Sequence, residues 1–187
     1  MKTESNGRFL RQLMLASIFA AMTTVLTYYL KIPMHNGYMH LGDSMIYLCA
    51  CFLPTPLAMA SAGIGGMLAD LFGGYTVYMI PTFIIKAMLV PAFNNRSAKI
   101  ITKRNCLAVP AAALITVLGY YVADVVVASA GSASGISDFF GYIADGKIWI
   151  AMLSGMPGNV MQAAASSAVF FILAAAMDKT QVKNKLL

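Results

Sequence analysis

The chain has 187 residues, of which 59% are hydrophobic and only 11% are charged. A soluble domain carries about 25% charged residues, so this composition excludes an ordinary soluble domain and predicts one integral-membrane unit over residues 1–187. The net charge of +6 does not indicate nucleic-acid binding, because the basic residues cluster at the ends of apolar segments, as cytoplasmic anchors do.

The first apolar segment covers residues 9–30 and follows Arg8 and Arg11. It is long enough to cross the hydrocarbon core and too long for the apolar part of a typical signal peptide, so we interpret it as a retained helix. A polar loop with Pro and Gly follows. Residues 44–72 are again apolar, but Pro54-Thr55-Pro56 interrupts them. This interruption allows one kinked helix or two short ones.

The distribution of positive charge distinguishes these two possibilities. Basic residues gather at the N-terminus, in the loop 94–105 and in the C-terminal tail, and positive segments of membrane proteins stay in the cytoplasm. All three lie inside only if the chain crosses an even number of times between Lys31 and Gly73, which makes Pro54–Pro56 a cytoplasmic turn. The sequence therefore predicts an all-α integral membrane protein, a six-transmembrane-helix bundle with both termini cytoplasmic. The helices are expected at about 9–30, 38–53, 56–72, 79–94, 106–130 and 147–177, with a Gly/Ser-rich loop over 131–147.

Four ionisable residues lie within or at the edge of these apolar segments: Asp43, Asp70, Lys86 and Asp124. A charge inside the membrane costs several kcal/mol and usually faces a water-filled cavity or another charge. The predicted topology places all four in the outer half of the membrane, which indicates one polar pocket opening outward. The candidate substrate-binding residues of this pocket are His40, Asp43, Asp70, Tyr75, Tyr78, Lys86, Asp124, Trp149, Asn159 and Gln162.

Several of these residues also have structural interpretations. Lys86 can form an ion pair with Asp70 or Asp43, and Asp43 can cap the helix that follows it. Trp149 can belong to an interfacial aromatic belt, and His35 is expected to be a solvated loop residue.

Two amides in the last helix, Asn159 and Gln162, are about one turn apart and share a face. Converging carboxylates, amides and aromatic rings suit a small, flat, polar heterocycle.

The first helix carries a stripe of small residues, Ala16-x-x-x-Ala20, and a second stripe one step on, Ser17-x-x-x-Ala21. Small residues at this spacing let two helices approach closely in lipid. The stripes therefore indicate packing inside the bundle or docking to another membrane protein. Gly63, Gly65, Gly66 and Ala69 form a similar stripe, for which packing inside the bundle is expected.

Some motifs are absent from the sequence. It has no GxxxxGK[ST] motif for ATP binding, no HExxH zinc motif and no GxSxG serine elbow. Its three cysteines form no CxxC pair and are interpreted as reduced packing residues. We therefore expect neither a cofactor nor a metal in this chain.

Two long stretches, GYMHLGDSMIYL (37–48) and GIGGMLADLFGGYTVYMIPTFIIKAML (63–89), resemble the substrate-binding S components of energy-coupling factor (ECF) vitamin transporters. The stretch MPGNVMQ (156–162) resembles the last helix of that family. HLGD and ADLFGGY…PTFIIK are the most specific parts, and they look closest to members assigned to hydroxymethylpyrimidine or pyridoxine-type substrates.

The resemblance implies a multi-pass protein of the prokaryotic plasma membrane with a vitamin site near the outer face. It also implies a transmembrane coupling protein and two cytoplasmic ABC ATPases as partners, which use the ATP, and docking to the coupling protein through Ala16 and Ala20. Two other classes remain open from the residues. One is a small intramembrane enzyme using His40 with Asp43 or Asp70. The other is a stand-alone proton-coupled carrier using Asp70 and Asp124.

Overall fold

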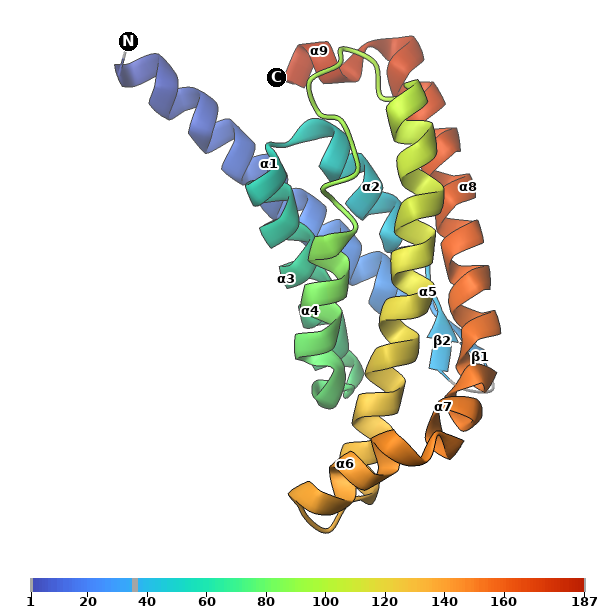
Figure 1. Ribbon diagram of the computed structural model, residues 1–187. Helices are drawn as coiled ribbons and strands as arrows, with labels where there is room; N and C mark the ends of the chain where they lie inside the picture. The colour runs from blue at the N-terminus through green and yellow to red at the C-terminus, as the bar shows by residue number, and fades with distance from the viewer. Residues whose placement is uncertain (1, 35–36, 187) are drawn as a thin grey trace.

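The computed structural model describes residues 2–34 and 37–186. Four long helices form the body of a bundle, namely α1 (Lys2–Tyr29), α3 (Thr55–Gly73), α5 (Lys103–Ser132) and α8 (Met156–Thr180) (Figure 1). In the described part of the chain, four helical stretches are long and apolar enough to cross a membrane, and two shorter apolar stretches cover Asp43–Phe52 and Thr76–Met88. Each of the six predicted segments overlaps one of these stretches, and the all-α bundle is confirmed.

The short helix α2 (Asp43–Phe52) is enclosed by protein, since all of its residues are buried. It ends where Leu53 becomes extended, as the residue before a proline usually does. Helix α3 begins at Thr55 with a proline in its first turn, so a turn is present at Pro54–Pro56 as predicted. A helix of 10 residues is too short to cross lipid by itself. Because α2 is surrounded by protein, it does not have to span the hydrocarbon core.

The structure differs from the predicted helix boundaries in the loop before α2. Residues expected to open a helix at 38 form strand β2 (Gly37–Met39), which pairs antiparallel with β1 (Ile32–Met34), and α2 begins only at Asp43. The register places Ile32 opposite Met39. Pro33 has no N–H to donate, which disfavours a helix and is compatible with an edge strand.

The later helices also differ from their predicted bounds. A short 3-10 helix η1 (Thr76–Tyr78) precedes α4 (Met79–Met88), which ends before Pro91 instead of at 94. The predicted helix 147–177 is divided into α7 (Lys147–Met152), η2 (Leu153–Gly155) and α8, followed by α9 (Val182–Leu186). The region predicted as a loop contains α6 (Ile136–Asp145). Its apolar residues recur at helical spacing, at Ile136, Phe139, Phe140 and Ile143.

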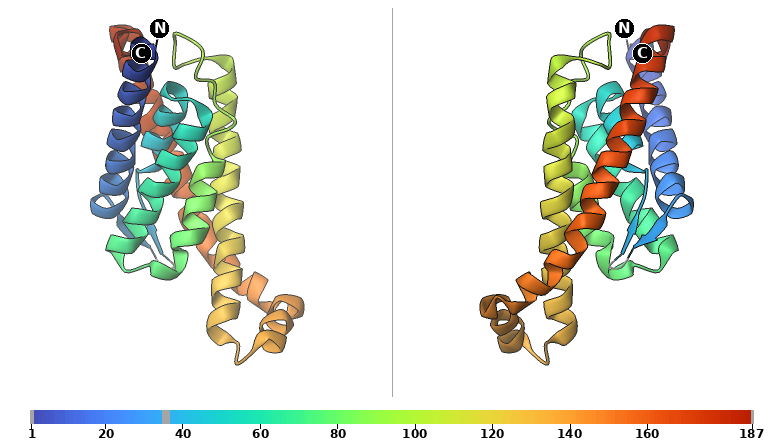
Figure 2. Two further views of the ribbon diagram at one scale, coloured as in Figure 1. Left: turned by 90° about the vertical axis from the view of Figure 1, so that its left-hand side faces the viewer. Right: turned by 90° about the vertical axis from the view of Figure 1, so that its right-hand side faces the viewer.

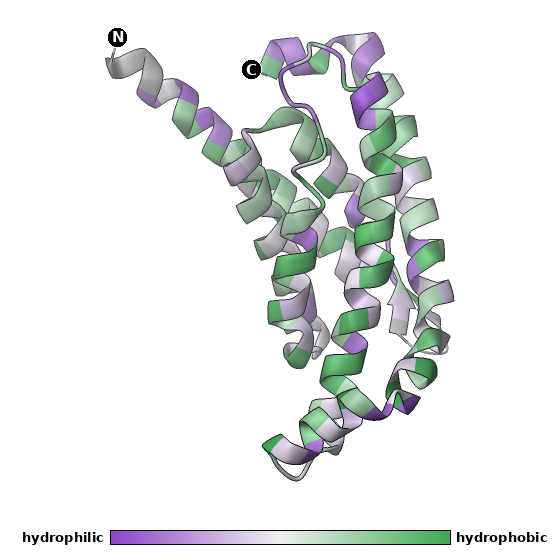
Figure 3. Cartoon of the chain, in the orientation of Figure 1, coloured by the Kyte–Doolittle hydropathy of each residue, from purple (hydrophilic) through white to green (hydrophobic). Residues whose placement is uncertain are grey.

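The two ends of the bundle differ in composition. Both chain termini and the loop 94–102 lie at one end, whereas the β1–β2 hairpin, η1, α6 and α7 lie toward the other (Figures 1 and 2). Hydrophilic residues concentrate at the end that carries the termini, and the middle of the long helices is mainly hydrophobic (Figure 3). Termini at the same end require an even number of passes along the bundle.

Helix α1 packs closely on α3 through the predicted stripes of small residues. Ser61 Oγ donates to the Ala16 carbonyl oxygen at 2.7 Å, and a Cβ added to Gly65 would lie 2.8 Å from the Ala20 carbonyl oxygen. Ala16 is buried and Ala20 is half-buried, whereas Ser17 and Ala21 are exposed. These contacts with α3 favour the packing interpretation of Ala16 and Ala20, and docking through them stays a prediction.

The loop 94–102 is held by the fully buried Asn105. Its side-chain oxygen accepts from the Asn94 N–H at 2.6 Å, and its nitrogen donates to the carbonyl oxygens of Ile100 at 2.8 Å and Asn94 at 3.2 Å. Asp178 adds two contacts, accepting from the N–H groups of Ile100 and Ile101 at 2.7 and 2.9 Å. Two residues from different helices thus order a long stretch without secondary structure.

We expect Asn105→Ala to destabilise the protein by about 3 kcal/mol, because buried backbone groups of the loop would lose their partners. Thermal unfolding in detergent micelles measures the effect. The matched control is Asn6→Ala, which changes an exposed asparagine and should leave the unfolding midpoint unchanged. Equal midpoints for the two variants would contradict a clamping role for Asn105.

Candidate functional site

A cavity of about 340 Å³ opens among β2, η1, η2 and the helices α3, α4, α5, α7 and α8. The hairpin and η1 place it toward the end of the bundle opposite the termini (Figures 1 and 2). Its lining combines phenols, carboxylates, amides and small residues: Tyr38, His40, Asp70, Tyr75, Tyr78, Thr82, Tyr120, Asp124, Met152, Ser154, Gly155, Gly158, Asn159 and Gln162. This is the type of lining that binds a small molecule with both an apolar face and polar edges.

The end of α3 directs two tyrosines to the cavity. Gly74 takes a left-handed conformation with φ of 80°, which glycine adopts without steric cost. Its N–H bonds to Leu71, and the Tyr75 N–H donates to the Asp70 carbonyl oxygen at 2.8 Å. This helix-ending motif turns the chain sharply, so that Asp70 at the end of α3 and Tyr75 and Tyr78 beyond it share one wall.

Each cavity carboxylate accepts a hydrogen bond from a phenol. Tyr78 Oη donates to Asp124 Oδ1 at 3.0 Å, and Tyr38 Oη donates to Asp70 Oδ1 at 3.2 Å. Burial, and then the neighbouring Asp70 carboxylate, raise the pKa of Tyr38 well above its usual value, so the phenol keeps its proton and acts as the donor. Asp70 Oδ2 is buried and has no hydrogen-bond partner among the described residues.

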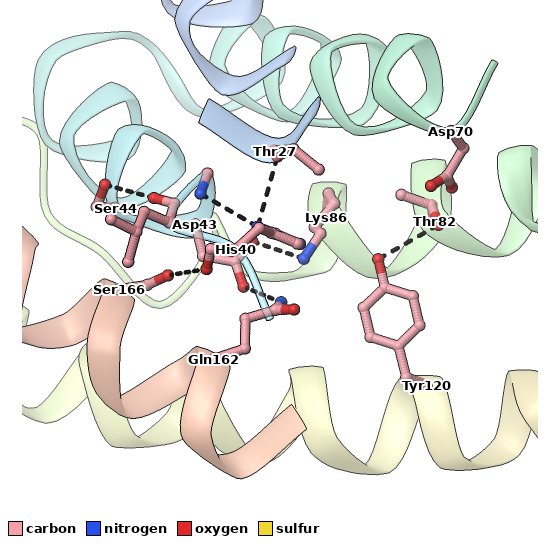
Figure 4. A network of polar contacts seen from close by, with 12 residues as sticks. Thr27, His40, Asp43, Ser44, Asp70, Thr82, Lys86, Tyr120, Gln162 and Ser166 are labelled. Atoms are coloured by element: carbon pink, nitrogen blue, oxygen red, sulfur yellow. Dashed lines mark hydrogen bonds and ion pairs between the residues drawn. The ribbon is translucent and has the colours of Figure 1, made fainter. Parts of the chain in front are cut away.

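Behind the cavity lies a buried ion pair. Lys86 Nζ is 2.6 Å from Asp43 Oδ1, and the two side chains are 1% and 0% exposed. Gln162 Nε2 donates to the other oxygen, Asp43 Oδ2, at 3.0 Å. The ammonium group also lies 5.0 Å from the centre of the Tyr120 ring, a cation–π distance. Figure 4 shows these side chains converging from α2, α4, α5 and α8.

His40 links the hairpin to this network as a neutral imidazole. Its Nδ1 accepts from the Gly42 N–H at 3.1 Å and lies 3.5 Å from Thr27 Oγ1. Burial, and then the charge of Lys86, lower the pKa of His40. Since Nδ1 is an acceptor, the proton of the neutral ring is on Nε2. Ser166 Oγ holds the backbone by donating to the His40 carbonyl oxygen at 3.2 Å.

The structure brings most of the predicted site residues together around the cavity. His40, Asp70, Tyr75, Tyr78, Asp124, Asn159 and Gln162 line it. Lys86 and Asp43 are not part of the lining, because they neutralise each other one layer behind it. Trp149 is also outside the lining, since its Nε1 donates to the Ile143 carbonyl oxygen at 3.0 Å and its ring packs against Tyr121. His35 lies outside the described residues.

Sequence reasoning missed Tyr38, Thr82, Tyr120, Met152, Ser154, Gly155 and Gly158. For two of them helical spacing carried a usable signal. Thr82 lies four residues before Lys86, and Tyr120 lies four residues before Asp124, so each shares a helix face with a residue already selected. Within the described residues no group of His, Cys, Asp or Glu is arranged to hold a metal ion.

We expect Lys86→Met to destabilise the protein by about 3–5 kcal/mol, because Asp43 would remain buried without a counter-charge. The double variant Asp43→Leu with Lys86→Met removes both charges and should recover most of this loss, since apolar residues of similar volume often replace a buried pair. Thermal unfolding in detergent measures both. A single variant as stable as the wild type would show that the pair contributes little to the fold.

Comparison with known proteins agrees with this architecture. A family model described as the S component of ECF-type riboflavin transporters matches residues 9–179. No curated protein matches the chain. A solved structure titled "Structure and mechanism of the S component of a bacterial ECF transporter" shares the fold with a TM-score of 0.63 and 18% identity, over 90% of this chain and 96% of that chain. The chain therefore belongs to the family of ECF-type riboflavin transporter S components, multi-pass proteins of the prokaryotic plasma membrane that bind a substrate and are not enzymes.

Proposed function

We propose that this chain is the substrate-specificity subunit of an ECF-type importer and captures a flat heterocyclic vitamin in the cavity described above. The observation that carries the proposal is the cavity itself, which joins aromatic rings to hydrogen-bonding groups on one side of the bundle. Rings of the vitamin would stack on tyrosines, and its polar edge would bond to carboxylates and amides. The matched family makes riboflavin the first candidate.

The cavity volume supports riboflavin. About 340 Å³ falls at the lower end of the ~300–1,000 Å³ range of drug-sized ligand sites. Riboflavin has three fused rings and a five-carbon polyol chain, so it belongs to that size class. The tyrosines around the cavity offer planar faces for an extended ring system, and Asn159 and Gln162 offer amides for its polar edge.

Hydroxymethylpyrimidine or pyridoxine is the second candidate. It is favoured by the segments HLGD and ADLFGGY…PTFIIK, which contribute His40, Asp70, Tyr75, Tyr78 and Thr82 to the lining. These are single-ring compounds and would fill only part of the cavity, leaving the rest to water. Competition against bound riboflavin separates the two candidates.

The family also supports a division of labour between subunits. We propose that a transmembrane coupling protein and two cytoplasmic ABC ATPases drive release of the vitamin into the cell, and that ATP is used only by those partners. The exposed face of α1 around Ser17 and Ala21 is the surface of small residues that remains available for docking, because Ala16 and Ala20 pack on α3.

Riboflavin titration of the protein purified in detergent should show binding near one molecule per chain, read by quenching of flavin fluorescence. Asp124→Asn should weaken it about ten-fold, because a charged acceptor in the cavity is lost. Asp138→Asn, which changes an exposed carboxylate of α6 outside the cavity, should have no effect. Binding of pyridoxine or hydroxymethylpyrimidine in place of riboflavin would favour the second candidate, and turnover of any of them would refute a pure binding role.

Ala21→Leu should abolish uptake by cells that supply the coupling protein and ATPases, while riboflavin binding by the isolated chain stays intact. Ala16→Leu should instead reduce the thermal stability of the isolated chain, since α3 fills that side. Uptake into vesicles by this chain alone, driven by a pH gradient, would contradict the dependence on partners and support a stand-alone carrier.

A further inference from the structure

The amide of Gln162 has a fixed orientation. Gln162 is 2% exposed and lines the cavity, and its Nε2 donates to Asp43 Oδ2 at 3.0 Å. An ionised carboxylate only accepts hydrogen bonds, so the nitrogen end of the amide must face Asp43. The carbonyl oxygen, Oε1, is then the end left to the cavity. It has no hydrogen bond to any of the described residues.

The carboxylate that orients Gln162 is itself fixed. Asp43 Oδ1 accepts from Lys86 Nζ at 2.6 Å, which leaves Oδ2 for Gln162. Lys86 is 1% exposed and lies over the Tyr120 ring. A pair of opposite charges with so little exposure has no water to exchange partners with, so this arrangement is more persistent than a surface ion pair. The order Lys86, Asp43, Gln162 is visible in Figure 4.

A buried amide free to rotate would present a donor or an acceptor to a ligand, whichever the ligand required. Here rotation would bring the Gln162 oxygen against a carboxylate oxygen, two acceptors that repel each other. The cavity therefore contains a preorganised acceptor at this position. Such a site discriminates strongly against an analogue that lacks the matching donor, because the buried acceptor is then left unpaired.

We propose that Gln162 Oε1 accepts a hydrogen bond from a ring N–H of the vitamin. The Asp43–Lys86 pair is then a positioning unit, which holds the Gln162 amide in the orientation that selects for this N–H. The inference rests on the proposed function and adds the chemistry of the ligand, a heterocycle with a hydrogen-bond donor in its ring. In riboflavin the single ring N–H is at N3. The charged pair acts through Gln162 and does not touch the vitamin.

The test compares riboflavin with 3-methylriboflavin, in which a methyl group replaces that hydrogen, on the purified chain. Wild-type protein should bind the methylated compound at least ~10-fold more weakly. Gln162→Met should weaken riboflavin binding and bring the ratio of the two affinities close to one. The variant Asp43→Leu with Lys86→Met, which keeps Gln162 but releases its amide, should also lower this ratio at least ~3-fold.

The control is the exposed ion pair Lys147–Asp145, 3.2 Å apart and 84% and 50% exposed. Asp145→Asn with Lys147→Gln should leave both affinities unchanged. Thermal unfolding confirms that each variant is folded before titration. If the variant without the buried pair keeps the wild-type ratio, the positioning role is refuted. If wild-type protein binds both flavins equally, the hydrogen bond from a ring N–H to Gln162 is refuted while the proposed function stands. Failure of wild-type protein to bind riboflavin at all overturns riboflavin as the substrate and this inference with it.

Discussion

The contact between Lys86 and Asp43 is the constraint around which the site is organised. Neither charge is stable alone in a bundle surrounded by lipid, so each specifies the position of the other. Their contact joins α4 to α2, and the second oxygen of Asp43 joins α2 to α8 through Gln162. Three helices distant in the sequence are thereby fixed in register at the depth where the cavity begins.

The cavity wall uses a second kind of pairing. There, phenols of the hairpin and of η1 donate to carboxylates of α3 and α5, which satisfies one oxygen of each acid with a neutral donor. These contacts differ from the ion pair because they leave the acids as acceptors toward the cavity. The Lys86–Asp43 pair behind the cavity thus has its charges neutralised, whereas Asp70 and Asp124 at the cavity wall each have only one oxygen bonded to a phenol. The wall carboxylates are therefore the ones suited to accept hydrogen bonds from a ligand.

Much of this arrangement was predictable from the residues. Positive charge at the termini and in the loop 94–105 indicated an even number of passes, and the misplaced charges indicated a single polar region. The pairing of Lys86 was predicted as one of two alternatives, since the linear sequence does not distinguish Asp70 from Asp43 as its partner. Lys86 pairs with Asp43 because α2 supplies the carboxylate that reaches the lysine on α4. This choice depends on how the helices pack, which the linear sequence does not show.

Other features were beyond the sequence argument for physical reasons. Tyr38 reaches the cavity because it lies on a β-hairpin that folds back over the bundle. The spacing of residues along a helix gives no information about such a hairpin. Packing and docking could not be separated in the sequence because Ala16 and Ser17 begin overlapping stripes, and only the packing of α3 shows which stripe is covered within this chain. Helix α6 was missed because Gly and Ser flank a segment of only 10 residues, whose composition resembles a loop.

The enclosure of α2 has a consequence for the relation between this protein and its bilayer. A helix that contacts acyl chains must match the thickness of the hydrocarbon layer or tilt, and any difference is a source of hydrophobic mismatch. Every residue of α2 is covered by neighbouring helices, so its length is independent of that thickness. The element that supplies the central carboxylate is therefore insulated from changes in lipid composition, while the long outer helices accommodate them.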